Sequence, residues 1–246
     1  MRVAAGAIAR KILPKVEIKG ALVQLGEHKI NRENWDDSFI EKNAFWSPDP
    51  TTIKIWEKYI EDLIKDGDSC GAIIEIIAKN VPIGLGAPVY GKLDAEIANG
   101  IMSINAVKGV EIGNGFENTE RWGREVQDVI EPNSSDIRNF SQISNNSGGI
   151  EGGMSNGNDI IINVAIKPIA TMTSPLPSVD IMTGEVVEAA YNRSDICQVS
   201  RACPVGEAML ALTLTESVLE KFGGDSLQEI KRNYMSYIKT FKEYGK

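Results

Sequence analysis

Apolar residues follow two spacings along this chain of 246 residues. Where they recur every three or four positions, as on one face of a helix, or where helix-forming residues dominate, we expect helices at 3–13, 53–66, 94–104, 204–222 and 226–244. Pro14 is expected to end the first helix, because proline cannot continue one. Thr51 or Thr52 is expected to cap the second. The apolar face of that second helix comprises Ile53, Ile55, Trp56, Tyr59, Ile60, Leu63 and Ile64.

The last two helices carry signals at their starts. Pro204 lies near a first turn, where its missing N–H is no loss. Ser226 is followed three positions later by Glu229, the pattern of a capping box. Both features predict where these helices begin.

Alternating or β-rich apolar runs predict strands at 16–26, 71–82, 106–116 and 160–168, with a shorter one at 184–191. In 71–82, one face of the strand comprises Ala72, Ile74, Ile76 and Ala78. The strand–helix–strand order from 71 to 116 suggests an α/β or α+β layer packing.

Residues 131–159 follow neither spacing and are rich in Asn, Ser and Gly. So long a stretch without periodicity inside a compact domain is typical of either a functional loop or a disordered segment. It contains Gly148-Gly149-Ile150-Glu151-Gly152-Gly153, where backbone can approach a ligand closely and N–H groups can hold an anion. A flexible surface loop is the alternative.

Composition narrows the class of protein. Hydrophobic residues make up 42% and charged residues 24%, which is ordinary for a globular domain. A net charge of −8 argues against general nucleic-acid binding, and no apolar run is long enough to predict a membrane span. Three cysteines, Cys70, Cys197 and Cys203, favour a reducing cytoplasmic setting over a disulfide framework. With His28 the single histidine, acid–base chemistry is expected to use other residues.

Two further groups raise the expectation of an anion or phosphate pocket. Lys167-Pro168 places a cation at the end of a predicted strand. Arg193 and Asp195, followed by Arg201, combine a forked anion-binding side chain with a carboxylate that an arginine would hold ionised. A solvated lysine and a weak surface ion pair are the alternative interpretations.

Five blocks of the chain, one of which contains Arg193, Asp195 and Arg201, resemble the chorismate synthase family, in that family's order. The blocks are 1–7 (MRVAAGA), 84–94 (GLGAPVYGKLD), 104–116 (INAVKGVEIGNGF), 145–157 (NNSGGIEGGMSNG) and 193–209 (RSDICQVSRACPVGEAM). Together they span nearly the whole chain, which makes the resemblance specific where one block alone would not be.

The resemblance implies an α+β fold, a sandwich of antiparallel sheets and helices, here a single domain over 1–246 with 131–159 as a cofactor-binding loop. It implies a lyase of the shikimate pathway of aromatic amino-acid biosynthesis. Such an enzyme converts 5-enolpyruvylshikimate-3-phosphate into chorismate and phosphate by 1,4-anti elimination, with reduced FMN and no net redox change. A cytoplasmic homotetramer is implied as well, with a flavin reductase and NADP as possible suppliers of reduced flavin.

By position, the resemblance assigns flavin contacts to Asn105, Ala106, Gly152, Lys167, Pro168, Ile169, Ala170, Thr171 and Arg193. It assigns the anionic substrate to Arg2 and Arg193, and the proton relay to Asp195, with no metal. Gly152, Lys167, Arg193 and Asp195 are therefore expected to surround one flavin-sized, positively lined cavity.

The sequence also departs from the family's pattern. The GESHG and SSARETA segments of the family's amino-terminal third are not in it, so we expect a truncated reading frame and a fold incomplete at the amino terminus. Ser194 replaces a histidine, and Ile169-Ala170 replace hydroxyl residues. The alternative function is an inactive fragment that keeps partial FMN binding or an oligomer interface.

Overall fold

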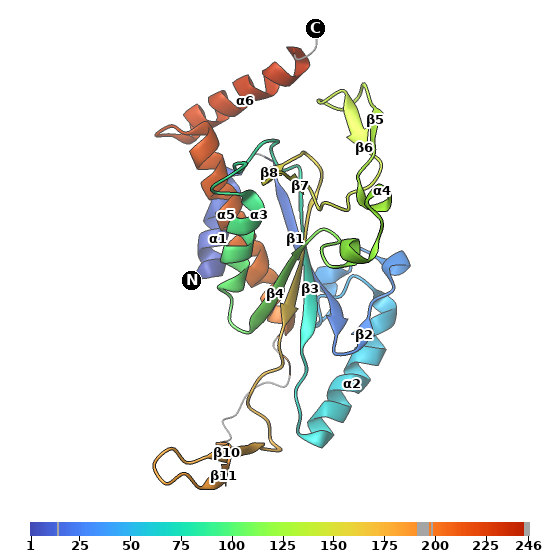
Figure 1. The fold of residues 1–246 in the computed structure, drawn as a ribbon, viewed down its shortest axis with the longest axis vertical. Coiled ribbons are helices and arrows are strands. Elements are labelled where there is room, and N and C mark those ends of the chain that lie inside the picture. The colour runs from blue at the N-terminus through green and yellow to red at the C-terminus, as the bar shows by residue number, and fades with distance from the viewer. Residues whose placement is uncertain (14, 191–196, 198, 244–246) are drawn as a thin grey trace.

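The fold is built on a five-stranded antiparallel sheet (Figure 1). The computed structural model describes residues 1–13, 15–190, 197 and 199–243. The strand order is β2 (His28–Lys29), β1 (Glu17–Leu25), β3 (Ala72–Lys79), β9 (Ile160–Ile166) and β4 (Val107–Ile112). Because β9 lies between β3 and β4, the two strands of the predicted strand–helix–strand unit are not neighbours in the sheet. All pairings in the sheet are antiparallel, which confirms the α+β class.

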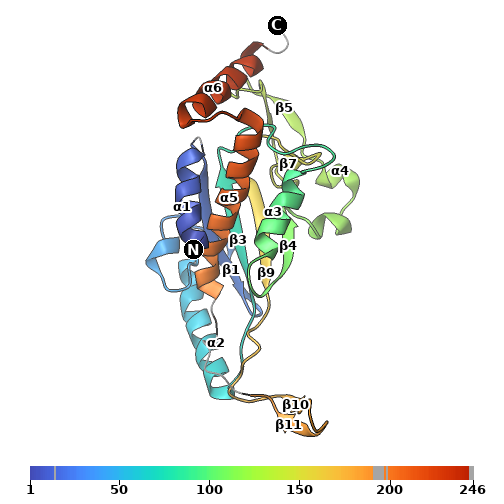
Figure 2. The same ribbon diagram turned by 90° about the vertical axis from the view of Figure 1, so that its left-hand side faces the viewer.

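Three helices cover one face of this sheet (Figure 2). They are α1 (Arg2–Ile12), α3 (Leu93–Met102) and α5 (Ala202–Phe222). The predicted alternation in β3 is confirmed, because Ala72, Ile74, Ile76 and Ala78 are all buried in this core. With the short turn before it, Val199–Phe222 is long and apolar enough to cross a membrane. It packs instead on α1, α3 and β1, as the core helix of the domain.

The closest approach in the helical layer joins α1 to α5. A Cβ built on Gly6 would lie 2.5 Å from the Cβ of Ala208 and 2.6 Å from its Cα. Real side chains do not come that close, so the two helices pack at this distance only with glycine at position 6. The contact fixes how α1 lies on the core.

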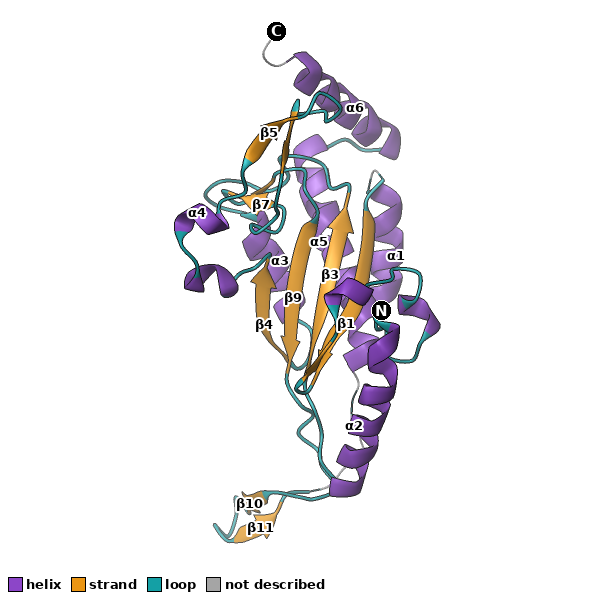
Figure 3. Cartoon of the chain, turned by 90° about the vertical axis from the view of Figure 1, so that its right-hand side faces the viewer, coloured by secondary structure: helices purple, strands orange, loops and turns teal. Residues whose placement is uncertain are grey.

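The opposite face of the sheet is more open (Figure 3). It carries an ion pair in which the carboxylate is buried and the guanidinium is exposed. Glu75 is 3% exposed although it is charged. Arg32 donates to its two carboxylate oxygens over 3.0 and 2.6 Å, a bidentate arrangement that compensates for burial of the charge.

Helix α2 (Ile53–Asp66) lies beyond β2 and only partly follows its predicted face. Trp56 is fully buried, but Ile55 and Ile64 are 49% and 56% exposed. Thr52 occupies the N-cap position of α2, as expected for one of the two threonines, but its side chain makes no capping hydrogen bond. A short turn, Pro50–Thr52, precedes the helix, and the Asp49 carboxylate accepts from the Thr51 N–H in this turn over 2.8 Å.

Residues 131–159 are folded into two small hairpins. One pairs β5 (Ile130–Pro132) with β6 (Phe140–Gln142), and the other pairs β7 (Ile150–Glu151) with β8 (Met154–Ser155). Asp128 anchors them, accepting from Ser144 Oγ and from the N–H groups of Asn146 and Ser147 over 2.6 to 2.9 Å. Burial alone would raise the pKa of the Asp128 carboxyl, but these hydrogen bonds lower it below its ordinary value.

The remaining elements lie at the two ends of the molecule (Figure 1). Helix α6 (Leu227–Glu243) crosses one end. The Glu229 N–H donates to Ser226 Oγ, but the Glu229 carboxylate accepts from Asp225, so the capping box is only half formed. At the other end β10 (Pro177–Val179) pairs with β11 (Val186–Glu188) in a projecting hairpin. The predicted strand at 184–191 is confirmed as β11.

Candidate functional site

Several of the predicted site residues meet where β9 ends and β4 begins. The Lys167 N–H donates to the carbonyl of Ala106 over 2.9 Å, which holds the two segments together just beyond the sheet. Ser69 Oγ donates to the Ile169 carbonyl over 2.7 Å and ties the following residues to the start of β3. Ala106 has a positive φ of 68°, uncommon for a residue with a Cβ, so this turn is held in place by its surroundings.

Arg2 lies at the same end of the molecule. Its Nη2 donates to the carbonyl of Ser103, the residue after α3, over 3.0 Å. The sequence 103–106 therefore lies between Arg2 on α1 and Lys167 after β9. We refer to Arg2, Asn105, Ala106 and 167–171 as the β9-end cluster.

Three polar side chains of the β9-end cluster reach solvent. Arg2, Asn105 and Lys167 are exposed, whereas Ala106, Ile169 and Thr171 are half-buried. Two cations and an amide thus surround a turn whose backbone is fixed. Such a set can hold an anionic or hydrogen-bonding ligand.

Gly152 lies elsewhere. It forms the turn between β7 and β8, with a φ of 60° and no atom within 4 Å of a Cβ built on it. The next residue, Gly153, accepts from the N–H of Leu93 at the beginning of α3 over 2.8 Å. Helix α3 leads from this turn to Asn105 and Ala106 at its other end. The expectation that Gly152 and Lys167 surround one cavity is therefore wrong within a single chain.

Strand β9 sets the distance between Gly152 and Lys167. Strand β9 runs from Ile160 to Ile166, and at about 3.3 Å per residue the strand alone spans roughly 20 Å. That is longer than a flavin ring. The predicted residues Arg193, Ser194 and Asp195 lie outside the described residues.

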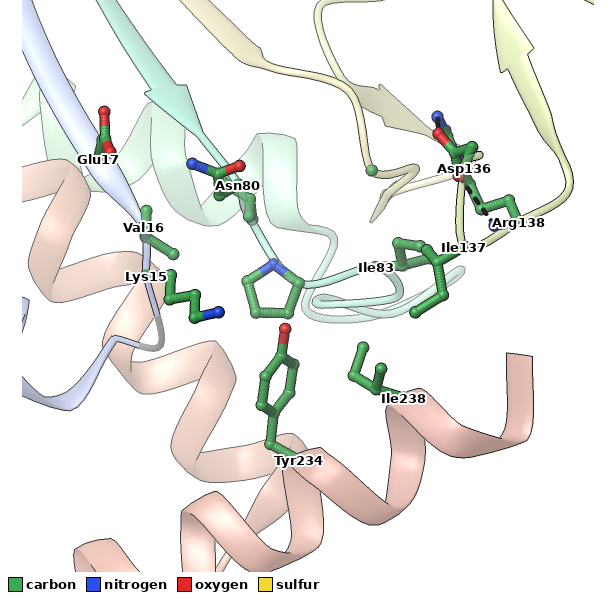
Figure 4. Close-up of a pocket in the computed structure, with 13 residues that line it drawn as sticks. Lys15, Val16, Glu17, Asn80, Ile83, Asp136, Ile137, Arg138, Tyr234 and Ile238 are labelled. Carbon is green, nitrogen blue, oxygen red and sulfur yellow. Dashed lines mark hydrogen bonds and ion pairs between the residues drawn. The ribbon is translucent and has the colours of Figure 1, made fainter. Parts of the chain in front are cut away.

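A cavity of about 690 Å³ at the Gly152 end was not foreseen (Figure 4). Tyr234 and Ile238 of α6 face Ile83 and Ile137 across it, with Lys15 and Asn80 beside them. Arg138 also borders it, but its guanidinium is engaged by Asp136 and by the Asn156 carbonyl over 2.8 Å. Burial raises the pKa of the Tyr234 hydroxyl. The only signal in the sequence was that 136–138 and Gly157 fall in the nonperiodic stretch.

Most of this chain matches a known protein family in sequence. The family described as chorismate synthase matches residues 1–219. The chain belongs to the chorismate synthase family. Chorismate synthases of Sinorhizobium medicae and Agrobacterium fabrum are 48% and 46% identical to it over 222 residues. That of Parvibaculum lavamentivorans is 47% identical over 231 residues.

Comparison with solved structures agrees with this family membership. A crystal structure of chorismate synthase superposes with a TM-score of 0.80 at 32% identity, covering 99% of this chain and 69% of the other. The relatives of Sinorhizobium medicae and Agrobacterium fabrum are matched over 90% of this chain but only 60% of their own length. The chain thus spans about 60% of the length of these chorismate synthases. The whole of α6 lies beyond the family match.

Proposed function

We propose that this chain performs, as part of a longer chorismate synthase, the elimination of phosphate from 5-enolpyruvylshikimate-3-phosphate to give chorismate. Membership of the family supports the reaction. The observation that carries the site is the β9-end cluster, where Arg2 and Lys167 place two cations beside the fixed turn at Ala106. We place the reaction in the cytoplasm, as part of aromatic amino-acid biosynthesis.

The cluster's chemistry fits reduced FMN. A flavin phosphate and the polar edge of a flavin ring are hydrogen-bond acceptors, and the exposed side chains of Lys167 and Asn105 are donors. We assign flavin contacts to Asn105, Ala106 and residues 167–171 of the β9-end cluster, to Gly152 and to Arg193. When bound, the reduced flavin supplies electron density to the breaking C–O bond, which no side chain of this chain can provide.

The protein's own residues bind, orient and move a proton. Arg2 and Arg193 hold the anionic substrate, and their positive charge stabilises the phosphate as it leaves. Asp195, held ionised by a neighbouring arginine, accepts the proton that is lost from C6. Ser194 cannot exchange a proton near neutral pH as a histidine does, so Asp195 carries this role alone in the 193–195 segment.

A homotetramer would account for the separation of Gly152 from Lys167. In one chain they lie at opposite ends of β9. In a symmetric assembly the turn at Gly152 of one protomer can approach the β9-end cluster of another. We propose that the flavin site is completed in this way, with a flavin reductase supplying the reduced cofactor where none is built in.

Phosphate release tests the function. The purified chain is mixed anaerobically with reduced FMN and 5-enolpyruvylshikimate-3-phosphate, and phosphate is measured beside a chain extended to the length of its relatives. Release by both supports the proposal for this chain, and release by the extended chain alone supports the inactive-fragment alternative. Release by neither contradicts the proposed function. Quenching of flavin fluorescence without turnover identifies a fragment that retains partial FMN binding.

Arg193→Ala in the extended chain is expected to weaken both flavin and substrate binding, each about tenfold or more, because a charge-assisted contact contributes about 1.5–3 kcal/mol. Fluorescence titration measures the first and the KM the second. Arg232→Ala is the matched control, since Arg232 lies exposed on α6 beyond the family match. Equal affinities in the wild type and Arg193→Ala would reject the assignment.

A further inference from the structure

A cavity of about 560 Å³ lies on the open face of the sheet, the face that Figure 3 shows. Its volume is within the range of small-molecule sites. Strands β3, β9 and β4 contribute two rows of side chains to it, and Arg32 and Trp35 border it from the segment before α2. None of these residues belongs to the β9-end cluster, so the cavity is separate from the proposed flavin site.

The first row of side chains is polar and charged. Glu75, Asn163 and Glu111 lie directly opposite one another on three neighbouring strands, so their side chains share this face. Because neighbouring strands are about 4.8 Å apart, the backbone of Glu75 lies about 10 Å from that of Glu111. Arg32 covers Glu75 through two hydrogen bonds. A cation therefore lies at one end of the row and a carboxylate at the other.

The cation keeps capacity for a second anion. A guanidinium has five N–H donors, and Arg32 gives two of them to Glu75, one from each Nη. Its side chain is 59% exposed, so the remaining donors are accessible to a ligand. The Nε side of the guanidinium is a second fork of the kind that binds a carboxylate.

The carboxylate at the other end of the row lacks a counter-charge. Glu111 accepts from the Phe116 N–H over 2.7 Å and from the Asn163 amide over 3.3 Å, and both donors are neutral. Among the residues that the structure describes, no cation pairs with it. Glu117 also lines the cavity, but Arg121 compensates its charge. An ammonium group would supply the missing positive charge at Glu111.

The second row of side chains is apolar. Ile77 and Ile161 are paired across β3 and β9, two residues from Glu75 and Asn163 and hence about 7 Å from the charged row. Trp35 borders the same part of the face, because it lines a second, small cavity together with Ile77. All three side chains of this apolar surface are half-buried. They offer an apolar surface beside the two charges.

We propose that this cavity binds a free α-amino acid with an aromatic or large apolar side chain. The carboxylate of the ligand takes the second fork of Arg32, and its ammonium group pairs with Glu111. Its side chain lies on Ile77, Ile161 and Trp35. An α-amino acid with a hydrogen bond of about 2.8 Å at each charged end spans about 8–9 Å, which matches the row. The inference does not depend on the proposed lyase activity, because this binding needs neither flavin nor shikimate-derived substrate.

Isothermal titration calorimetry of the full chain with L-phenylalanine tests the proposal. We expect saturable binding. Three analogues, each of which lacks one group, should bind about tenfold or more weakly. They are 3-phenylpropionate without the ammonium group, 2-phenylethylamine without the carboxylate, and glycine without the side chain.

Glu111→Gln isolates the ammonium contact. Glutamine can still accept from the Phe116 N–H, so the turn after β4 is kept while the charge is lost. L-Phenylalanine should bind to this variant about tenfold or more weakly, whereas 3-phenylpropionate should bind no more weakly than to the wild type. Glu33→Gln is the matched control, because Glu33 is exposed and follows Arg32 but does not line the cavity.

The proposal is overturned if L-phenylalanine does not bind to a sample that circular dichroism shows to be folded. It is also overturned if 3-phenylpropionate or 2-phenylethylamine binds as tightly as L-phenylalanine, or if Glu111→Gln leaves the affinity for L-phenylalanine unchanged. Glycine that binds as tightly as L-phenylalanine would overturn the role of the apolar row.

Discussion

Asp195→Asn, in a chain extended to the length of its relatives, is expected to lower turnover by about a hundredfold or more, the usual contribution of a positioned acid–base group. Asparagine keeps the size and much of the hydrogen bonding of aspartate but cannot accept the proton. Binding should change little, so the loss falls on kcat, whereas KM and flavin affinity stay near their original values.

The measurement is the initial rate of phosphate release at saturating substrate and reduced flavin. Asp62→Asn is a suitable control, because Asp62 is an exposed aspartate on α2 that pairs only with the nearby Lys65 among the interactions described for it. Unchanged turnover in Asp195→Asn would remove Asp195 from proton transfer. An equal loss in both variants would point to a general effect on folding.

Gly6→Leu is expected to destabilise the folded chain by about 3 kcal/mol, at the upper end of what overpacking costs. Even a Cβ at this position would overlap Ala208 on α5, so a leucine must push α1 away from the core. The helix would then lose part of its buried contact, including the hydrogen bond from Thr215 Oγ1 to the Ala9 carbonyl. Urea unfolding followed by circular dichroism measures the change.

Ala5→Leu provides the comparison on the same helix. Ala5 precedes Gly6 but is exposed, so the same side chain there points away from α5 and should alter the free energy of unfolding by less than about 0.5 kcal/mol. Equal stability of the Gly6 and Ala5 variants would mean that α1 does not pack on α5 as described.

The regular elements could be predicted because each follows from a local pattern. Burial of Ile74 and Ile76 in β3 was expected from their alternation, and the helices begin and end close to where their composition indicated. The order of the strands could not be read in this way, since insertion of β9 between β3 and β4 is a long-range pairing. The hairpins within 131–159 could not be predicted because polar turns and the half-buried Asp128, not apolar spacing, hold them.

The candidate site was predictable only in part. Position within the family identified Ala106 and Lys167, and the structure brings these two together. The order of motifs along the chain does not give the distances between them in the fold, however. Nothing in the sequence therefore indicated that Gly152 lies at the far end of β9. The roles of Arg193 and Asp195 stay predictions.

Strand β9 connects the two ends of the proposed site through a single run of backbone. It is paired on both sides, with β3 and β4, and its side chains alternate between the helical core and the open face. A slip of one residue in its register would turn every one of these side chains to the wrong face. It would also displace the glycine turn and Lys167 by the same step, so one strand sets the alignment of both.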